Sequence, residues 1–591
     1  MTKYKSELGI REYYELRLLE KSKDKFNLQH QHYQLFYKGI PVEGSFYSIH
    51  YQDDRLLAAQ GTIILDLEMD VLGVIPESAA LLTALSAANT SAEEVKKEGT
   101  KMDGVLLLAQ CKEDFLKQSY CLAYAFDLTD KKDNSPYRIY VDARSGQVVK
   151  RIPLYQNCFE SSDSVEPFSH EPSQVSSGQT VNLSPKVTST FIPNHARYLA
   201  GQSSLSFETL PSGSNFALRF NTNVGNALQV QQDLNANGMF DDGDILNPTT
   251  NWANNNANAT TAHWVIQRMY QYMLSTFGRN GVDGNSNLAR VSVGDPRANF
   301  AQWRHFENRI LIGFGQGTGL SLSTLDIVSH ELMHGYTNYM TGVSNLSGSS
   351  LEFNTLNEAF SDMLATMMER EILPNDWNWT IGEDAWLLRN MSNPELSEVP
   401  QPRTYQGANW SYDVVQDGPH RNNGFLNRWF FLITDGEQGN TGPRVYPIGM
   451  QASSNIVYRV IDDYIQPSSG FATFRNATLF VSNFLYGTCS HESRQVINAW
   501  NNVGYSTGSS CPDNCSYTIT ATASPTSTSC NSPVSLTANC VGSGCDYIEY
   551  SWYGPGISGT LNGQTVNITT PSTPGVHTYN GVYFSFVKQP F

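Results

Sequence analysis

Two histidines four positions apart, with a glutamate directly after the first, are the residues best suited to metal chemistry in this sequence. His330, Glu331 and His334 occupy a stretch that we expect to be helical, with Ser323 or Thr324 as its cap. Four residues make about one helical turn, so both imidazoles face one side and can bind a single tetrahedral Zn²⁺. Glu331 then lies near the open coordination position, where its carboxylate can accept a proton from water.

A catalytic zinc also needs a third protein ligand. Glu358 lies in a second predicted helix around residues 356–362 and is the natural candidate. Asp362 follows one turn later on the same face, where it can accept the ring N–H of a ligand histidine and fix its orientation. The competing interpretation is two ordinary helices with chance histidines and solvated carboxylates. Finding both motifs in one chain disfavours it.

The run Asn357-Glu358-Ala359-Phe360-Ser361-Asp362, placed after His-Glu-x-x-His, resembles the thermolysin family of metalloendopeptidases. The resemblance covers residues 190–505 and implies a β-rich N-terminal lobe and a helical C-terminal lobe, with a cleft over the zinc helix. Four more segments resemble family parts in the family's order: 299–303, an edge strand that binds substrate; 379–384, a calcium segment; 388–391, with an arginine that contacts substrate; and 418–424, with a transition-state histidine.

The resemblance implies hydrolysis of peptide bonds within protein or peptide substrates, with Zn²⁺ and Ca²⁺ as cofactors. Glu331 would be the general base, and His420 would hydrogen-bond the oxyanion as charge develops there. The remaining implied roles are zinc binding by His330, His334 and Glu358, orientation of a ligand by Asp362, and substrate binding by Arg389, Ala301 and Trp303.

The sequence departs from the family pattern near the oxyanion. The family's tyrosine between the two zinc motifs aligns with Asn345 or Ser349, depending on the direction of counting. A second donor would then be lost or come from elsewhere, with Tyr405 and Tyr412 as candidates. The family's aspartate that orients the catalytic histidine also fails to align, and Asp417 could substitute for it.

Two groups of oxygen-bearing residues are predicted to bind calcium, because hard oxygen ligands suit Ca²⁺. The first follows from the family resemblance. The second, at 233–244, follows the EF-hand spacing with glycine at the sixth position. Unconnected surface carboxylates and an ion-free Asx turn are the competing interpretations. The predicted ligands are Asp326, Glu369, Asp376, Asn378 and Glu383 in the first group and Asp233, Asn235, Asn237, Asp241 and Asp244 in the second.

Composition narrows the class of protein. A formal charge of −17 and the absence of any basic run argue against nucleic-acid or membrane-surface partners. No stretch approaches the ~20 apolar residues that span a bilayer, and residues 1–20 show no signal peptide. Cysteines clustered after Cys489 in a Ser/Thr-rich tail nevertheless indicate disulfides and an oxidising compartment. We therefore expect a secreted protein, acting as a monomer.

The expected fold is multidomain α+β. Residues 1–155 resemble the fungalysin/thermolysin propeptide followed by a PepSY-like module, which implies an inhibitor of the chain's own activity. Residues 156–190 are predicted to be a linker with the processing site, and 191–505 the two-lobed zinc domain. Within the zinc domain, 262–277 has helical periodicity that ends at Gly278. Short strand patterns at 534–538, 547–552 and 564–569 predict an Ig-like or PKD-like β-sandwich over 511–591.

Two other functions compete with an endopeptidase. A surface or adhesion protein could retain the zinc fold as a scaffold with weak catalysis, which the missing tyrosine and the β-sandwich tail favour. Retention of Glu331 disfavours it, because a scaffold needs the ligands but no general base. An exopeptidase would need acidic residues that grip the substrate amine, and the sequence shows no such pattern.

Overall fold

In a computed structural model of the chain, residues 10–23, 28–52, 55–65, 67–97, 102–112, 119–132, 135–157, 187–200, 202–221, 227–232, 245–253, 256–294, 300–305, 308–315, 319–342, 351–412, 417–437, 443–506, 517–542, 548–553, 555, 557, 561–573 and 580–585 are described. The chain divides into two compact units. One comprises Met1–Phe431 and Ser454–Val481, and the other comprises Leu432–Ser453 and Ser482–Phe591. The second predicted calcium loop, 233–244, and most of the predicted linker lie outside the described residues.

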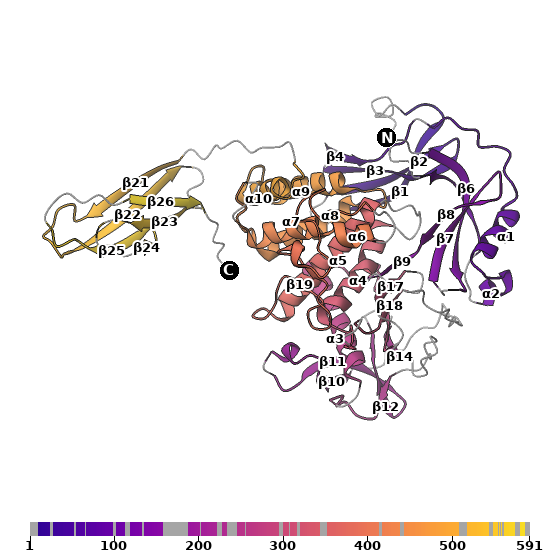
Figure 1. The fold of residues 1–591 in the computed structure, drawn as a ribbon, viewed down its shortest axis with the longest axis horizontal. Helices are drawn as coiled ribbons and strands as arrows, with labels where there is room; N and C mark the ends of the chain where they lie inside the picture. The colour runs from indigo at the N-terminus through magenta and orange to yellow at the C-terminus, as the bar shows by residue number, and fades with distance from the viewer. Residues whose placement is uncertain are drawn as a thin grey trace. The chain divides into compact units, whose positions relative to one another are not determined.

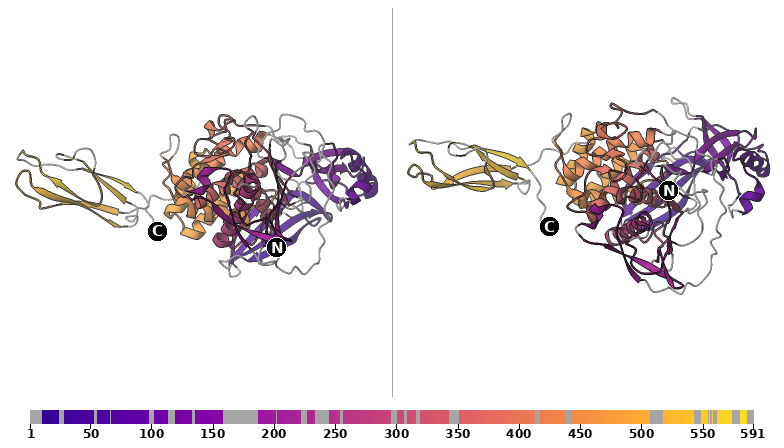
Figure 2. Two further views of the ribbon diagram at one scale, coloured as in Figure 1. Left: turned by 90° about the horizontal axis from the view of Figure 1, so that it is seen from below. Right: turned by 60° about the horizontal axis from the view of Figure 1, so that its bottom comes forward.

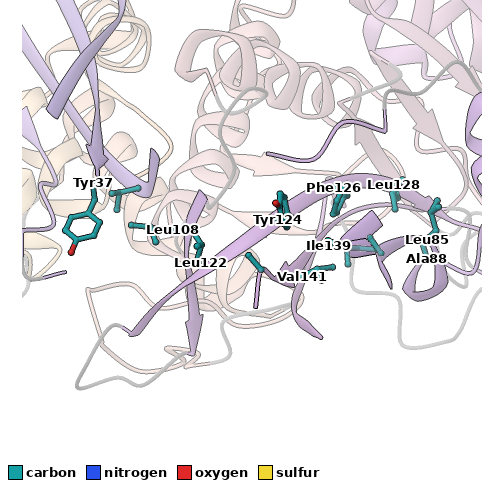
Figure 3. Close-up of a cluster of buried hydrophobic side chains, with 14 of the residues drawn as sticks. Tyr37, Leu85, Ala88, Leu108, Leu122, Tyr124, Phe126, Leu128, Ile139 and Val141 are labelled. Atoms are coloured by element: carbon teal, nitrogen blue, oxygen red, sulfur yellow. The ribbon is translucent and has the colours of Figure 1, made fainter. Parts of the chain in front are cut away.

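The N-terminal region is built on an eight-stranded sheet in the order β1-β2-β3-β5-β6-β7-β8, with β4 also paired to β3. Alternation of apolar and polar residues puts one face of these strands into a core. The core contains Leu108, Leu122 and Phe126, and helix α1 packs there against β6–β8 (Figures 1 and 3). The elements are β1 Tyr14–Lys23, β2 Gln29–Tyr37, β3 Ile40–Gln52, β4 Arg55–Gly61, α1 Glu77–Ala87, α2 Ala92–Lys97, β5 Val105–Lys112, β6 Ser119–Asp130, β7 Ser135–Asp142 and β8 Val148–Pro153.

Two further sheets follow in the first compact unit. A four-stranded sheet has the order β10-β11-β12-β15, and a six-stranded sheet has the order β13-β14-β16-β18-β17-β9. Strand β9 comes directly after β8, so the second sheet includes a strand from the N-terminal part of the chain. The elements are β9 Tyr155–Asn157, β10 Val187–Phe191, η2 Ala196–Leu199, β11 Leu205–Ser212, β12 Asn215–Ala217, β13 Arg219–Asn221, β14 Ala227–Gln232, β15 Leu246–Asn247, β16 Arg290–Val293, β17 Ala301–Arg304 and β18 Arg309–Ile312.

Helices dominate from residue 257 to residue 502. The predicted end at Gly278 is confirmed, because Gly278 adopts the left-handed conformation after a π-helical turn, while the helix begins five residues earlier than predicted, capped by Asn256. Helices α4 and α5 run beside each other and carry the two metal motifs (Figure 1). The elements are α3 Ala257–Tyr272, η3 Met273–Phe277, α4 Leu325–Thr341, α5 Leu351–Ile372, β19 Thr380–Ile381, β20 Arg389–Asn390, η4 Pro394–Leu396, α6 Asp417–Asn422, α7 Gly424–Asp435, α8 Gly449–Tyr464, α9 Phe471–Tyr486 and α10 His491–Asn502. None of the described helices combines the length and the apolar content needed to cross a bilayer.

The C-terminal tail consists of two three-stranded sheets, β21-β22-β25 and β24-β23-β26. Their strands share one long direction (Figure 2), and Leu536, Trp552 and Ile568 belong to a small apolar core that draws on both sheets. The strands are β21 Tyr517–Ser524, β22 Pro533–Gly542, β23 Ile548–Tyr553, β24 Leu561–Asn562, β25 Thr565–Thr569 and β26 Asn580–Ser585. The three strands predicted here from sequence correspond to β22, β23 and β25.

Candidate functional site

Helix α4 presents the first metal motif. The hydroxyl of Thr324 accepts a hydrogen bond from the backbone N–H of Ile327 and caps the start of the helix, and Gly342 ends it in the left-handed conformation with φ of 69°. His330, Glu331 and His334 lie in the middle of this helix and are fully buried. The predicted cap is therefore confirmed for Thr324, and the motif is held on a rigid, enclosed element.

Three side chains converge on one point. The Nε2 atoms of His330 and His334 are 3.1 Å apart. Each of them also lies 3.4 Å from a carboxylate oxygen of Glu358, which α5 supplies. Ligand atoms that surround a tetrahedral zinc at about 2.0–2.1 Å are separated by about 3.3 Å. The three residues therefore fit a zinc ion. Among the described residues, they form the group of His, Cys, Asp or Glu side chains whose ligand atoms all lie within 4.8 Å of one another.

The opposite ring nitrogens are held by neighbours on α5. Nδ1 of His330 lies 2.8 Å from Asp362 Oδ1. Nδ1 of His334 lies 3.3 Å from Asn357 Oδ1 and 3.1 Å from Ser361 Oγ. These contacts place an N–H on each Nδ1 and leave each Nε2 lone pair facing the metal point. The expected contact of Asp362 with a ligand histidine is present, and Asn357 and Ser361 of the same sequence motif contact the other ligand histidine.

Burial and neighbouring charges keep the side chains of this cluster in the protonation states that bind a metal ion. Burial lowers the pKa of His334 to about 3, so its imidazole is neutral at physiological pH. Burial alone would raise the pKa of Glu358, but His420 and His334 hold it well below its usual value. Glu358 is therefore an anion. A neutral imidazole beside an anionic carboxylate is the donor chemistry that zinc binds.

Two more expected residues reach this centre. His420, on α6, places Nε2 3.4 Å from Glu358 Oε1 and is partly exposed. Arg389, on β20, is buried, with its guanidinium 3.0 Å from Asp362 Oδ1 and 3.3 Å from Glu358 Oε2. The chain thus brings a partly accessible imidazole and a buried cation to the same carboxylate that completes the metal site.

The predicted substrate strand is β17, and another strand pairs with it. Ala301 and Trp303 are buried in β17, which pairs with β18 on one side and with β9 on the other. In the antiparallel register with β9, Trp303 faces Gln156 and Gln302 faces Asn157. The strand expected at the edge of the sheet is therefore covered by residues 155–157, a pairing that sequence patterns did not indicate.

The suggested replacements for the family's tyrosine and aspartate are only partly placed. Asn345 and Ser349 lie outside the described residues, and the side chain of Asp417 does too. The ring of Tyr405 packs against Trp410, Phe425 and Phe471, and Tyr412 is 69% exposed. The Tyr405 ring thus belongs to an aromatic cluster, and the Tyr412 side chain faces solvent.

The first predicted calcium group meets an arginine that the sequence did not single out. Asp326 and Glu369 are buried, and Asn378 donates a hydrogen bond of 2.7 Å to Glu383 Oε1. Asp376 has an exposed side chain, and its main-chain oxygen accepts a 3.3 Å hydrogen bond from Arg197 Nη1. The guanidinium of Arg197 lies among these groups, 2.6 Å from Glu369 and 2.8 Å from Glu383.

Family models match most of the described fold. The model "Thermolysin metallopeptidase, catalytic domain" matches residues 195–338, and "Thermolysin metallopeptidase, alpha-helical domain" matches residues 350–505. The "Fungalysin/Thermolysin Propeptide Motif" matches residues 14–63. The metal point lies between α4, in the first match, and α5, in the second.

Known proteases align over most of the chain. Bacillolysin of Brevibacillus brevis is 27% identical over 528 residues, which cover 85% of this chain and 88% of that protein. The thermostable neutral protease NprT of Geobacillus stearothermophilus is 28% identical over 84% of this chain and 87% of its own length. Thermolysin of Bacillus caldolyticus is 28% identical over 83% and 86%. The propeptide motif, the catalytic domain and the helical domain thus follow one another along the chain, and the three zinc ligands come from the last two. The chain therefore belongs to the thermolysin family of zinc metalloendopeptidases and carries that family's propeptide.

Proposed function

We propose that this chain is the precursor of a secreted, monomeric zinc endopeptidase that hydrolyses protein substrates after release from its own N-terminal region. The convergence of His330, His334 and Glu358 on one point carries the catalytic part of the proposal. The pairing of β9 with β17 carries the inhibitory part. Secretion is supported by the cysteine-bearing tail and by the disulfide between Cys111 and Cys121.

The catalytic roles follow from which groups surround the metal point. A zinc ion held by the three ligands supplies Lewis acidity and lowers the pKa of water. Glu331 takes the proton of the attacking water and passes it to the leaving amine. His420 donates a hydrogen bond to the developing oxyanion, since its ring is the partly exposed one in this cluster. Arg389 holds Glu358 and Asp362 in place, and its guanidinium orients the substrate by hydrogen bonding.

The inhibitory role follows from strand pairing. A peptide substrate that binds in extended form adds a strand to β17 through main-chain hydrogen bonds, with its side chains alternating between the two faces. Residues 155–157 already form those main-chain contacts. While β9 is paired, a substrate cannot use β17. Cleavage in the predicted linker, after residue 157, frees the segment to leave.

Removal of the base tests the catalytic proposal. In purified and processed protein, Glu331→Gln is expected to lower kcat/KM on a protein substrate ~10²–10⁴-fold, because the water loses its proton acceptor. Zinc content measured by mass spectrometry should stay at one ion per chain. Glu371→Gln, an exposed glutamate on α5, is the matched control and should keep full activity. A Glu331→Gln enzyme with unchanged turnover would refute the assigned role.

Three further assays separate the competing functions. A zinc chelator should abolish cleavage, and added zinc should restore it. A peptide blocked at both ends should be cut internally, whereas an exopeptidase would leave it intact. A scaffold with weak catalysis would show no cleavage even after the N-terminal region is removed.

Disruption of β9 tests self-inhibition. Gln156→Pro removes a backbone N–H and fixes φ, which weakens the pairing with Trp303. The uncut variant should cleave a small peptide faster than the uncut natural sequence does. Gln156→Ala, which keeps the backbone N–H and the freedom of φ, is the matched control. Equal activity of the proline and alanine variants would remove support for the inhibitory role of β9.

A further inference from the structure

A single arginine contacts three carboxylates from two separate segments. Nη1 of Arg197 lies 2.6 Å from Glu369 Oε1, Nη2 lies 2.8 Å from Glu383 Oε1, and Nε lies 2.7 Å from Asp384 Oδ2. Glu369 belongs to α5, while Glu383 and Asp384 belong to the loop that follows it. All three guanidinium nitrogens therefore lie within ion-pair distance of a carboxylate oxygen, and Nε and Nη2 donate hydrogen bonds to Asp384 and Glu383.

Glu369 and Glu383 are among the residues for which the family resemblance implies calcium, and Asp384 ends the segment 379–384 that resembles the family's calcium segment. We propose that Arg197 supplies the cation at this position, so that the chain joins α5 to the 376–384 loop without calcium there. The proposal concerns stability and metal dependence, and it holds or fails separately from the catalytic roles assigned above.

The donor set as arranged does not fit a calcium ion. Calcium requires six to eight oxygens at about 2.3–2.6 Å. In the described ranges, no three of these carboxylates bring one oxygen each within 4.8 Å of one another. Most of their oxygens face N–H donors instead: Asn378 Nδ2 donates to Glu383 Oε1, the backbone N–H of Asn378 donates to Glu369 Oε2, and the backbone N–H groups of Ile327 and Gly382 donate to Asp326. Glu383 Oε2 is buried without a hydrogen-bond partner.

The contacts extend to the zinc helix. Tyr198, the next residue after Arg197, donates a 2.6 Å hydrogen bond to Asp384 Oδ2. The same hydroxyl accepts a 2.9 Å hydrogen bond from the backbone N–H of Leu325 at the start of α4. Glu369 lies on α5, three turns after Glu358. Arg197 and Tyr198 together thus link the loop to both helices that carry zinc ligands.

The test compares calcium responses in the uncut chain, with Glu331→Gln as the background so that the protein does not digest itself. Melting temperature is measured with zinc buffered at a fixed free concentration, with and without millimolar calcium. The parent should gain less melting temperature from calcium than Arg197→Gln gains, because its Arg197 already occupies the acidic group. Arg197→Gln should melt roughly 5–10 °C lower without calcium, because one buried and two partly buried carboxylates lose their cation. Calcium should restore at least half of that loss, because it can enter the vacated acidic group.

Matched variants keep the result interpretable. Arg268→Gln removes an exposed arginine on α3 and should neither lower the melting temperature much nor create a calcium response. If Arg197→Gln fails to fold, Arg197→Lys, a point charge that can serve only one carboxylate well, should show a smaller loss and a smaller calcium recovery. Any calcium bound at 233–244 contributes equally to parent and variants and cancels in the comparison.

Two outcomes would overturn the proposal. One is a parent protein that calcium stabilises as strongly as it stabilises Arg197→Gln, with the effect removed by Glu369→Gln, which would place calcium in this group despite the arginine. The other is an Arg197→Gln protein that loses stability equally with and without calcium, which would make Arg197 a packing residue rather than a replacement cation.

Discussion

At the residue scale, the metal site depends on a buried carboxylate that binds no metal. Asp362 Oδ1 lies 2.8 Å from His330 Nδ1 and 3.0 Å from Arg389 Nη1. Asp362 Oδ2 accepts hydrogen bonds of 2.8 Å and 2.7 Å from Asn423 and Asn427. Burial would raise the pKa of Asp362, but Arg389 and His330 lower it, so the carboxylate remains an anion. Its negative charge fixes the His330 tautomer and raises the basicity of the ligand nitrogen.

Asp362→Asn should therefore weaken zinc binding by ~10–100-fold, because the amide can present an N–H instead of an acceptor to His330. Competition with a chromophoric chelator at pH 7.5 measures this change. Ser361→Ala is the comparison variant, and a smaller loss is expected because His334 keeps its contact with Asn357. Equal zinc affinity of Asp362→Asn and the natural sequence would contradict this account.

Sequence reasoning found the residues whose positions helical periodicity fixes. His330 and His334 share a face of α4, and Glu358 and Asp362 share a face of α5, so spacing alone predicts their neighbours. Arg197 could not be found in this way, because its partners lie 172 to 187 positions away. Nothing in a local pattern distinguishes such an arginine from one on the surface. The pairing of β9 with β17 escaped for the same reason.

At the element scale, the distance between the zinc helix and the substrate strand is set by a missing side chain. Gly335 follows the ligand His334, and a Cβ added there would lie 2.7 Å from the ring of Trp303. That ring is buried and belongs to β17. Glycine at this position allows α4 and β17 to approach closely, which brings the proposed substrate strand near the helix that carries the metal ligands.

Gly335→Ala should destabilise the catalytic region by ~1–2 kcal/mol, because overpacking costs more than the gain in helix propensity. It should also lower kcat/KM, since Trp303 and β17 must move away from α4. Guanidinium unfolding and peptide kinetics measure the two effects. The double variant with Trp303→Phe, which frees space, should recover part of the stability. No recovery in that cycle would indicate another cause.

At the scale of the whole molecule, the N-terminal region contacts helix α8 through histidines. Nδ1 of His30 lies 2.7 Å from Nδ1 of His50, and Nε2 of His30 lies 3.5 Å from Asp463. His32 contacts Gln466 at 2.6 Å. Arg459, Asp462 and Tyr464 are the other charged or titratable groups of α8 that face the histidines or Asp463.

Acid should weaken this contact. Burial lowers the pKa of His30 and His32 to about 4 and that of His50 further, so three histidines stay neutral in contact and take up protons once separated. Burial raises the pKa of Asp463 to about 7, so Asp463 is protonated in the contact and releases one proton on separation. Between pH 6.5 and 4 separation therefore takes up about two net protons, three less one, and the equilibrium shifts by up to ~100-fold per pH unit.

Size-exclusion chromatography of protein cut within 158–186 measures this dependence. The N-terminal fragment should stay bound at pH 7.5 and separate at pH 5.5. His50→Gln, which cannot titrate, should reduce the slope by one proton. A bound fraction that is constant across this range would refute the role of the histidines.

Because β9 follows β8 without an intervening loop, its three residues are tethered beside β17 by a folded sheet. A tethered segment acts at an effective concentration that is on the order of millimolar or higher and does not change when the protein is diluted. Competing peptides in solution would have to reach similar concentrations to displace it. Dilution would therefore leave β9 paired with β17. Only a cut in the chain after β9 would turn this intramolecular pairing into a binding equilibrium that dilution can reverse.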